Sequence, residues 1–228
     1  TDVYRHTFPR MASKTKRFYE RYPVDVERVA ALADILDSRK VVLPNGDPLT
    51  VERLQCLGAD FGMKPSFERV HWMLDQAFLD GDGSVSAGSE VSDEFLHGVM
   101  NATSSRPLYW PLQEFIYANG ELDEPIRWAA QRVRDEHPEF NTDVRPLNFT
   151  GECMFPWMFE RENALRPFKP AMDVLMEDTH FGMIYDADQL ARNEVPLQAA
   201  VYYDDMYVDS GLQLDTLSRV ARSHLLDY

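Results

Sequence analysis

The amino-acid sequence predicts an α/β protein in which a mainly helical region precedes a single strand–helix unit of an incomplete sheet. Apolar residues recur at helical spacing in several segments of about the first 190 residues. The one convincing buried strand, 197–203, comes late in the chain and is followed by a helical pattern over 212–223. Because a lone buried strand cannot satisfy its backbone, we expect its neighbours outside this chain, with one more strand starting at Leu225. A minor alternative pairs it with residues 41–49.

The opening segments of the helical region differ in how clearly they predict structure. Residues 1–20 are largely polar and show no clear period. The next segment, 25–36, predicts an amphipathic helix from the spacing of Val26, Val29, Ala30, Ala33 and Leu36. Residues 41–49 form a short extended piece with an Asn-Gly turn, and Thr50 is a plausible N-cap for a further helix.

The middle of the chain alternates helical patterns with loops. Ser66 is placed to cap a helix whose apolar face comprises Val70, Met73, Leu74, Ala77 and Phe78. Residues 80–90 are rich in Gly, Ser and Asp and predict a loop. Helical patterns resume over 92–97, 108–117 and 124–136, and Pro-bounded irregular segments follow. This organisation predicts helices rather than a large sheet before residue 190.

Composition excludes several classes of function. A formal net charge of -15 disfavours a nucleic-acid groove, which needs clustered Lys and Arg. No run is long and apolar enough to predict a membrane span. Cys56 and Cys153 are the two cysteines, so we expect neither a disulfide framework nor a Cys-based zinc site, and a cytoplasmic setting. The six histidines lack metal-binding spacing, and the segment 80–91 lacks the ligands of a calcium loop, so no metal or cofactor is predicted.

Two adjacent carboxylates, Asp204 and Asp205, stand where the predicted strand ends. Open α/β sheets bind their ligands outside the carboxyl ends of the strands. The acid of a Ser-Asp-His triad can occupy such a strand end, after the nucleophile and before the His in chain order. The sequence therefore predicts part of a hydrolase.

Two further carboxylates, Glu114 and Glu152, lie within aromatic, apolar segments. Burying a carboxylate is costly unless a donor or a cation accompanies it. One interpretation is a structural Glu bonded to backbone amides or to an Arg. The other is an anionic, aromatic-walled pocket for an ammonium group, in which charge pairing and cation–π attraction act together. Both interpretations remain open from the residues alone.

The chain resembles the larger prolyl aminopeptidases (proline iminopeptidases), which are serine peptidases of the α/β-hydrolase fold. The matching segments are Phe18–Arg28, Leu43–Thr50, Phe149–Phe159, Asn193–Pro196 and Tyr202–Val208. The resemblance implies a helical cap inserted between two strands of the hydrolase core. Residues 1–190 would then be the cap, the substrate-recognition domain, and residues 191–228 the C-terminal part of the core.

The resemblance also implies roles for single residues. Asp205 matches the triad acid, with Asp204 as the alternative. Glu114 and Glu152 match the two cap glutamates that bind the imino group of an N-terminal proline. Aromatic residues close the proline pocket in that family, and the candidates near the two glutamates in sequence are Trp110, Phe155 and Trp157.

The implied activity is release of N-terminal proline from a peptide by acyl transfer through a serine ester. The nucleophilic Ser, the oxyanion hole and the catalytic His are expected outside this chain, since His224 follows Asp205 too closely. The chain alone is then expected to be inactive. The alternatives are another capped α/β-hydrolase, such as an esterase or epoxide hydrolase, and a non-catalytic helical module that binds peptide N-termini. The sequence does not define an oligomeric state.

Overall fold

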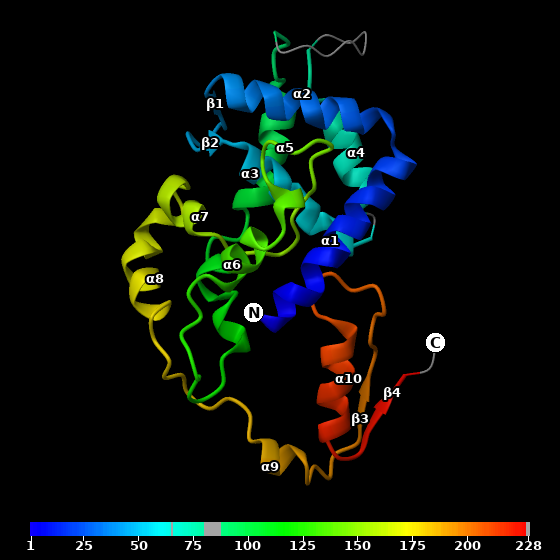
Figure 1. Ribbon diagram of the computed structural model, residues 1–228, viewed down its shortest axis with the longest axis vertical. Coiled ribbons are helices and arrows are strands. Elements are labelled where there is room, and N and C mark those ends of the chain that lie inside the picture. The colour runs from blue at the N-terminus through cyan, green and yellow to red at the C-terminus, as the bar shows by residue number, and fades with distance from the viewer. Residues whose placement is uncertain (65, 80–87, 227–228) are drawn as a thin grey trace.

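The computed structural model describes residues 1–64, 66–79 and 88–226 of the chain. A helical body occupies most of the molecule, and α9 leads from it to a smaller unit of two strands and one helix near the C-terminus (Figure 1). The elements in chain order are α1 Asp2–Arg21, α2 Val24–Ser38, β1 Val41–Val42, β2 Pro48–Leu49, α3 Val51–Gln55, α4 Phe67–Asp75, α5 Asp93–Ser104, α6 Ala129–Asp135, α7 Pro156–Arg161, α8 Lys169–Leu175, α9 Ala187–Leu190, β3 Leu197–Ala199, α10 Ser210–Arg219 and β4 Ser223–Leu225.

Helix α1 is long and central, although residues 1–20 show no clear period in the sequence. It spans 20 residues and continues through Pro9. Two threonines lie among the apolar residues of its buried face, which obscures the helical spacing in the sequence. That face comprises Tyr4, Thr7, Phe8, Met11, Thr15 and Phe18. Phe18 packs against Phe61 and Phe149, with ring centroids 4.9 and 5.8 Å away, so α1 joins segments distant in the sequence.

The segments with strong local signals fold as predicted. The 25–36 pattern lies within α2, and Val41 pairs antiparallel with Leu49 around the Asn-Gly turn. The Thr50 hydroxyl accepts a hydrogen bond of 3.3 Å from the Arg53 amide, which caps α3. The pairing of residues 41–49 with the late strand is therefore not formed.

Other helices differ from prediction at their ends. Helix α4 ends at Asp75, before Ala77 and Phe78, and the Ser66 side chain makes no capping hydrogen bond. Helix α5 runs beyond the predicted 92–97 to Ser104. Residues 80–87 of the predicted loop lie outside the described residues.

The predicted helix over 108–117 is instead two 3₁₀ turns, 110–112 and 115–117. Pro111 lies within the first of them and has no amide hydrogen to donate to a continuing helix. The predicted helix over 124–136 is shortened to α6 because Arg127 and Trp128 adopt positive φ angles of 48° and 56°. These backbone angles lie outside the right-handed helical region.

The C-terminal unit contains a parallel strand pair. β3 and β4 align Leu197 with Ser223 and Ala199 with Leu225, and α10 connects them in a βαβ arrangement. The strand predicted over 197–203 ends at Ala199, since the described residues offer β3 no partner beyond β4. It is also not buried, because Leu197 is 41% exposed. The second strand begins at Ser223, two residues before the expected position.

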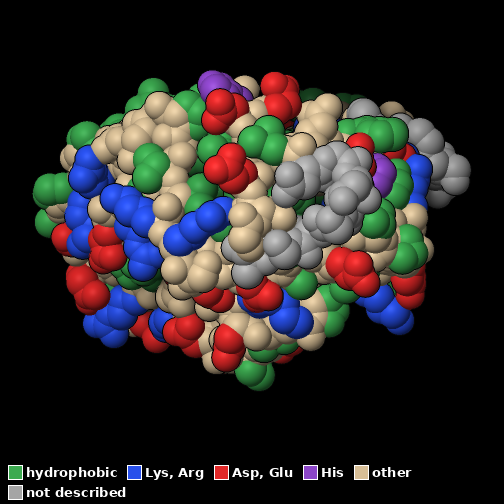
Figure 2. All heavy atoms as spheres, turned by 90° about the horizontal axis from the view of Figure 1, so that it is seen from above, with side chains coloured by type: hydrophobic (Ala, Val, Ile, Leu, Met, Phe, Trp, Pro, Cys, Tyr) green, Lys and Arg blue, Asp and Glu red, His purple; other side chains and the backbone are tan. Residues whose placement is uncertain are grey.

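The surface carries charges of both signs despite the acidic composition. Acidic, basic and hydrophobic side chains are mixed over the face seen in Figure 2. None of the described helices combines the length and apolar character needed to span a bilayer. The mixture of many helices and small sheets agrees with the predicted α/β class.

Candidate functional site

The segment 202–209 follows β3 and docks onto one face of α1 by ion pairs. The Asp204 carboxylate contacts Lys14 Nζ at 2.7 Å and Arg17 Nη1 at 2.5 Å. Partial burial opposes ionisation of Asp204, but the hydrogen bonds from Lys14 and Arg17 outweigh it and lower the pKa of the carboxyl below its usual value. Asp204 is thus fully engaged with two cations.

Asp205 presents its carboxylate differently. Its Oδ1 accepts hydrogen bonds from the amides of Tyr207 at 2.7 Å and Val208 at 3.1 Å. Its carbonyl oxygen accepts one of 3.1 Å from Arg10. Among the described residues, Oδ2 has no hydrogen-bond partner, so one carboxylate oxygen is fixed and the other is left available.

The residues after Asp205 anchor this turn in the helical body. Met206 is 1% exposed and belongs to the core, and the Tyr207 hydroxyl donates to the Ala59 carbonyl. Gly62 allows this contact, because a Cβ there would lie 2.3 Å from the Tyr207 ring. Asp209 contacts Arg10 at 2.6 Å and also caps α10. Contacts of the residues before and after Asp205 in the chain therefore fix its position.

The buried Glu114 side chain lies against the first residues of α6. Its Oε2 accepts a hydrogen bond of 3.0 Å from the Ala129 amide, and its Oε1 one of 2.8 Å from the Ala130 amide. Burial raises the pKa of Glu114 to about 7, although these amide hydrogen bonds favour the ionised form. The carboxyl thus has a pKa near neutrality.

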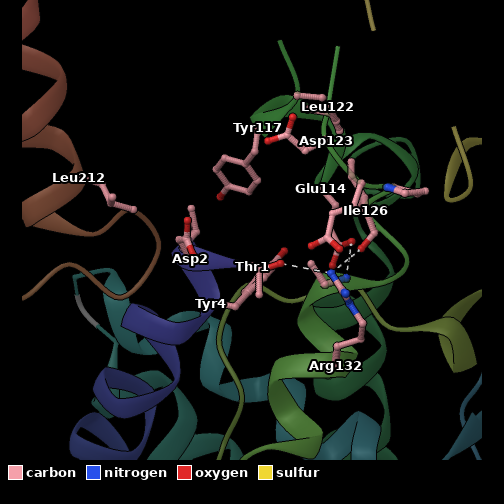
Figure 3. Close-up of a pocket in the computed structure, with 15 residues that line it drawn as sticks. Thr1, Asp2, Tyr4, Glu114, Tyr117, Leu122, Asp123, Ile126, Arg132 and Leu212 are labelled. Carbon is pink, nitrogen blue, oxygen red and sulfur yellow. Dashed lines mark hydrogen bonds between the residues drawn. The ribbon is translucent and has the colours of Figure 1, made fainter. Parts of the chain in front are cut away.

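A cavity of about 450 Å³, here called the Glu114 cavity, adjoins this carboxyl. Tyr4, Tyr117 and Arg132 also line it, and the Tyr117 ring points into the space between Asp2 and Glu114 (Figure 3). The Tyr4 hydroxyl donates to Gln113 Oε1 at 2.9 Å. Aromatic and charged groups therefore surround Glu114.

Glu152 is half-buried and lines a second cavity of about 400 Å³, here called the Glu152 cavity. Tyr109 and Trp110 line the same cavity, and their rings meet edge to face at 5.4 Å. The pKa of the Tyr109 phenol is raised above its usual value. Burial is the largest cause, and a hydrogen bond with Glu152 is the second. Trp110, which the sequence analysis proposed for the proline pocket, thus shares a cavity with Glu152.

The two glutamates line different cavities, rather than facing each other across one cleft. The amides of Ala129 and Ala130 hold the Glu114 carboxyl against the start of α6, where it lines the Glu114 cavity. The segments that carry Glu114 and Glu152 are nevertheless adjacent, since Gln113 Nε2 donates to the Glu152 carbonyl at 3.4 Å.

Tyr117 connects the predicted site residues electrostatically. Its partial burial and the negative charges of Glu152, Glu114 and Asp205 raise the pKa of the phenol to about 12. Tyr117 thus feels the charges of all three carboxylates, and it lines the Glu114 cavity. Sequence reasoning did not select Tyr117, although it ends the aromatic segment that contains Glu114.

Phe155 and Trp157 lie in the core, and neither lines the two cavities described above. Their rings stack with centroids 6.2 Å apart, and the Arg134 guanidinium lies 5.3 Å from the Phe155 ring centroid. Both belong to the chain segment that follows Glu152. No group of three or more His, Cys, Asp or Glu among the described residues is arranged to hold a metal ion.

Comparison with known proteins adds the family context, although no family model matches the chain. A proline iminopeptidase from Aeromonas sobria is 39% identical over 225 residues, which cover 97% of this chain and 50% of that protein. The proline iminopeptidase aneH from Aspergillus aculeatus is 33% identical over 211 residues, which cover 92% of this chain and 46% of that protein. The chain spans about half the length of these curated relatives. The resemblance inferred from the motifs is thereby confirmed: nearly the whole chain corresponds to about half of a proline iminopeptidase.

Proposed function

We propose that this chain supplies the substrate-recognition part and the triad acid of a serine exopeptidase that releases N-terminal proline from peptides. The observation that supports this most strongly is the Asp205 carboxylate, which two backbone amides orient through Oδ1 while Oδ2 has no partner among the described residues. An exopeptidase needs an anionic site for the free amine next to its catalytic centre. Glu114 and Glu152, whose segments are joined by the hydrogen bond from Gln113 to the Glu152 carbonyl, would supply that site.

Asp205 is the proposed triad acid. In a Ser-His-Asp triad, the acid accepts a hydrogen bond from the His Nδ1–H, holds the ring in its catalytic tautomer and stabilises the imidazolium. The two amide bonds to Oδ1 would orient Asp205, and Oδ2 would accept the imidazole proton. The serine and the histidine would come from the remainder of the enzyme. Asp204 is less suited to this role because Lys14 and Arg17 occupy its carboxylate.

Glu152 and Glu114 are the proposed anionic groups for the substrate amine. In the Glu152 cavity, Tyr109 and Trp110 add aromatic faces to the carboxylate, which suits the secondary ammonium of an N-terminal proline. Glu114 would act as the second carboxylate from the neighbouring cavity. Of the predicted aromatic residues, Trp110 would form part of the proline pocket. Phe155 and Trp157 would act indirectly, by anchoring the chain just after Glu152 in the core.

The domain organisation follows from the same proposal. Residues 1–190 would form the cap, and residues 191–228 the returning part of an α/β-hydrolase core. The βαβ arrangement of β3, α10 and β4 supports this division, because parallel pairs of this kind normally lie within larger sheets covered on both faces.

The test uses the complete enzyme and a chromogenic amide of proline. Asp205→Asn should lower kcat by about 10⁴-fold with little change in KM, as expected for loss of a triad acid. Asp204→Asn is the matched control and should have a much smaller effect. The proposal is wrong if both variants keep full activity. A free-amine preference that survives both Glu152→Gln and Glu114→Gln would show that other groups bind the amine, and an unsubstituted enzyme without that preference would favour a hydrolase of neutral substrates.

A further inference from the structure

The Glu152 cavity contains a cation that the proposed proline binding does not use. Arg106 lines this cavity beside Ser105 and Asn101, just after α5 ends. It is exposed, and its side chain makes no ion pair or hydrogen bond to any described residue. The other arginine of the cavity, Arg69, is paired with Asp60 at 3.1 Å. Arg106 is therefore the cavity arginine available to a ligand among the described residues.

Tyr109 places the charges of Arg106 and Glu152 in one neighbourhood. The Tyr109 amide donates to the Arg106 carbonyl at 3.1 Å, which forms a tight turn from one residue to the other. The Tyr109 phenol is in turn bonded to Glu152 and feels the positive charge of Arg106. A ligand in this cavity would thus meet both an anion and a cation.

We propose that Arg106 binds the free carboxylate of a small zwitterion whose ammonium pairs with Glu152. The guanidinium offers donors in a planar fork that matches a carboxylate. The cavity of about 400 Å³ falls within the range of small-molecule sites, roughly 300 to 1,000 Å³. The ligand is a short peptide that begins with proline, or the free amino acid that its cleavage releases. This inference rests on the amine-binding role of Glu152 in the proposed function.

Calorimetric titration of the complete enzyme, with its nucleophilic serine replaced by alanine, tests the proposal without requiring catalysis. Prolylglycine should bind about tenfold more tightly than prolylglycinamide, which lacks the carboxylate. Arg106→Gln should remove this difference, and Arg106→Lys should retain part of it. Arg166→Gln is the matched control, since Arg166 is also exposed but bonds Asn163 away from this cavity. The control should leave the tenfold difference unchanged.

Two outcomes separate the failure of this inference from failure of the proposed function. Equal binding of acid and amide by the protein with Arg106 intact would overturn the role of Arg106. Equal binding of prolylglycine and its N-acetyl derivative would overturn the amine-binding role of Glu152 instead. Free proline binding as tightly as prolylglycine would support the amino acid as the ligand, and much weaker binding would support the short peptide.

Discussion

Two ion pairs between α1 and the segment 202–209 should contribute very different amounts to stability. Arg10 and Asp209 approach to 2.6 Å, and the Asp209 side chain is 3% exposed. Arg17 and Asp204 approach to 2.5 Å, but their side chains are 53% and 47% exposed. The same helix and the same segment therefore provide a buried pair and an exposed pair.

Replacing each arginine by methionine keeps most of its aliphatic volume and removes its charge. For Arg10→Met, the buried Asp209 carboxylate loses its cation, a change that typically costs about 3 to 5 kcal/mol. We expect the lower end, about 3 kcal/mol, because Asp209 keeps its hydrogen bond from the Leu212 amide and has His6 at 3.7 Å. For Arg17→Met, an exposed pair is lost, at a cost of about 0.5 kcal/mol.

Urea unfolding followed by circular dichroism measures both free energies of unfolding. Asp209→Asn combined with Arg10→Met gives a further check, since Asn preserves the helix cap but carries no charge. The double variant should be more stable than Arg10→Met alone. Equal losses for Arg10→Met and Arg17→Met, or simple additivity in the double variant, would refute the reasoning.

Three other predictions concern local features of the fold. Folded Glu114 holds its proton up to about pH 7 instead of 4.5, so stability should fall by up to roughly 3 kcal/mol as pH rises through that window. Glu114→Gln should flatten this fall in urea titrations at several pH values, and an unchanged slope would contradict it. Gly58→Ala should cost about 1 to 3 kcal/mol because the new Cβ would lie 2.5 Å from Phe149 Cβ. Gly182→Ala, with open space around it, is the control and should be near neutral in thermal melts. Thr50→Ala should cost about 1 kcal/mol through loss of the α3 cap, and no change in the melting temperature would argue against that cap.

The sequence predicts the fold well where the signal is local. Helix α2 and the cap at Thr50 depend on contacts between residues a few positions apart, and both are found. Helix α1 was not predictable in the same way. Thr7 and Thr15 interrupt its apolar face, and Thr15 is buried because its hydroxyl accepts a hydrogen bond from the Phe149 amide. Tertiary contacts of this kind leave no periodic trace in the sequence.

In the candidate site, too, the sequence predicts what depends on local motifs and not what depends on tertiary contacts. The motifs select Asp205, Glu114 and Glu152, but not the arrangement that relates them. The separate cavities of the two glutamates follow from the hydrogen bonds that α6 donates to Glu114. The position of Tyr117 depends on how the 3₁₀ turns replace the expected helix. Both are consequences of backbone geometry, which the residue types alone do not specify.

The attachment of segment 202–209 to α1 also has a consequence for the timing of synthesis. Arg17 and Asp204 are separated by 187 positions in the chain. At about 5 to 20 residues per second, a ribosome needs roughly 10 to 40 s to reach Asp204 after making Arg17. During that interval the basic side chains of α1 have none of their acidic partners from this segment. The Asp205 turn can therefore become ordered on α1 only after that interval.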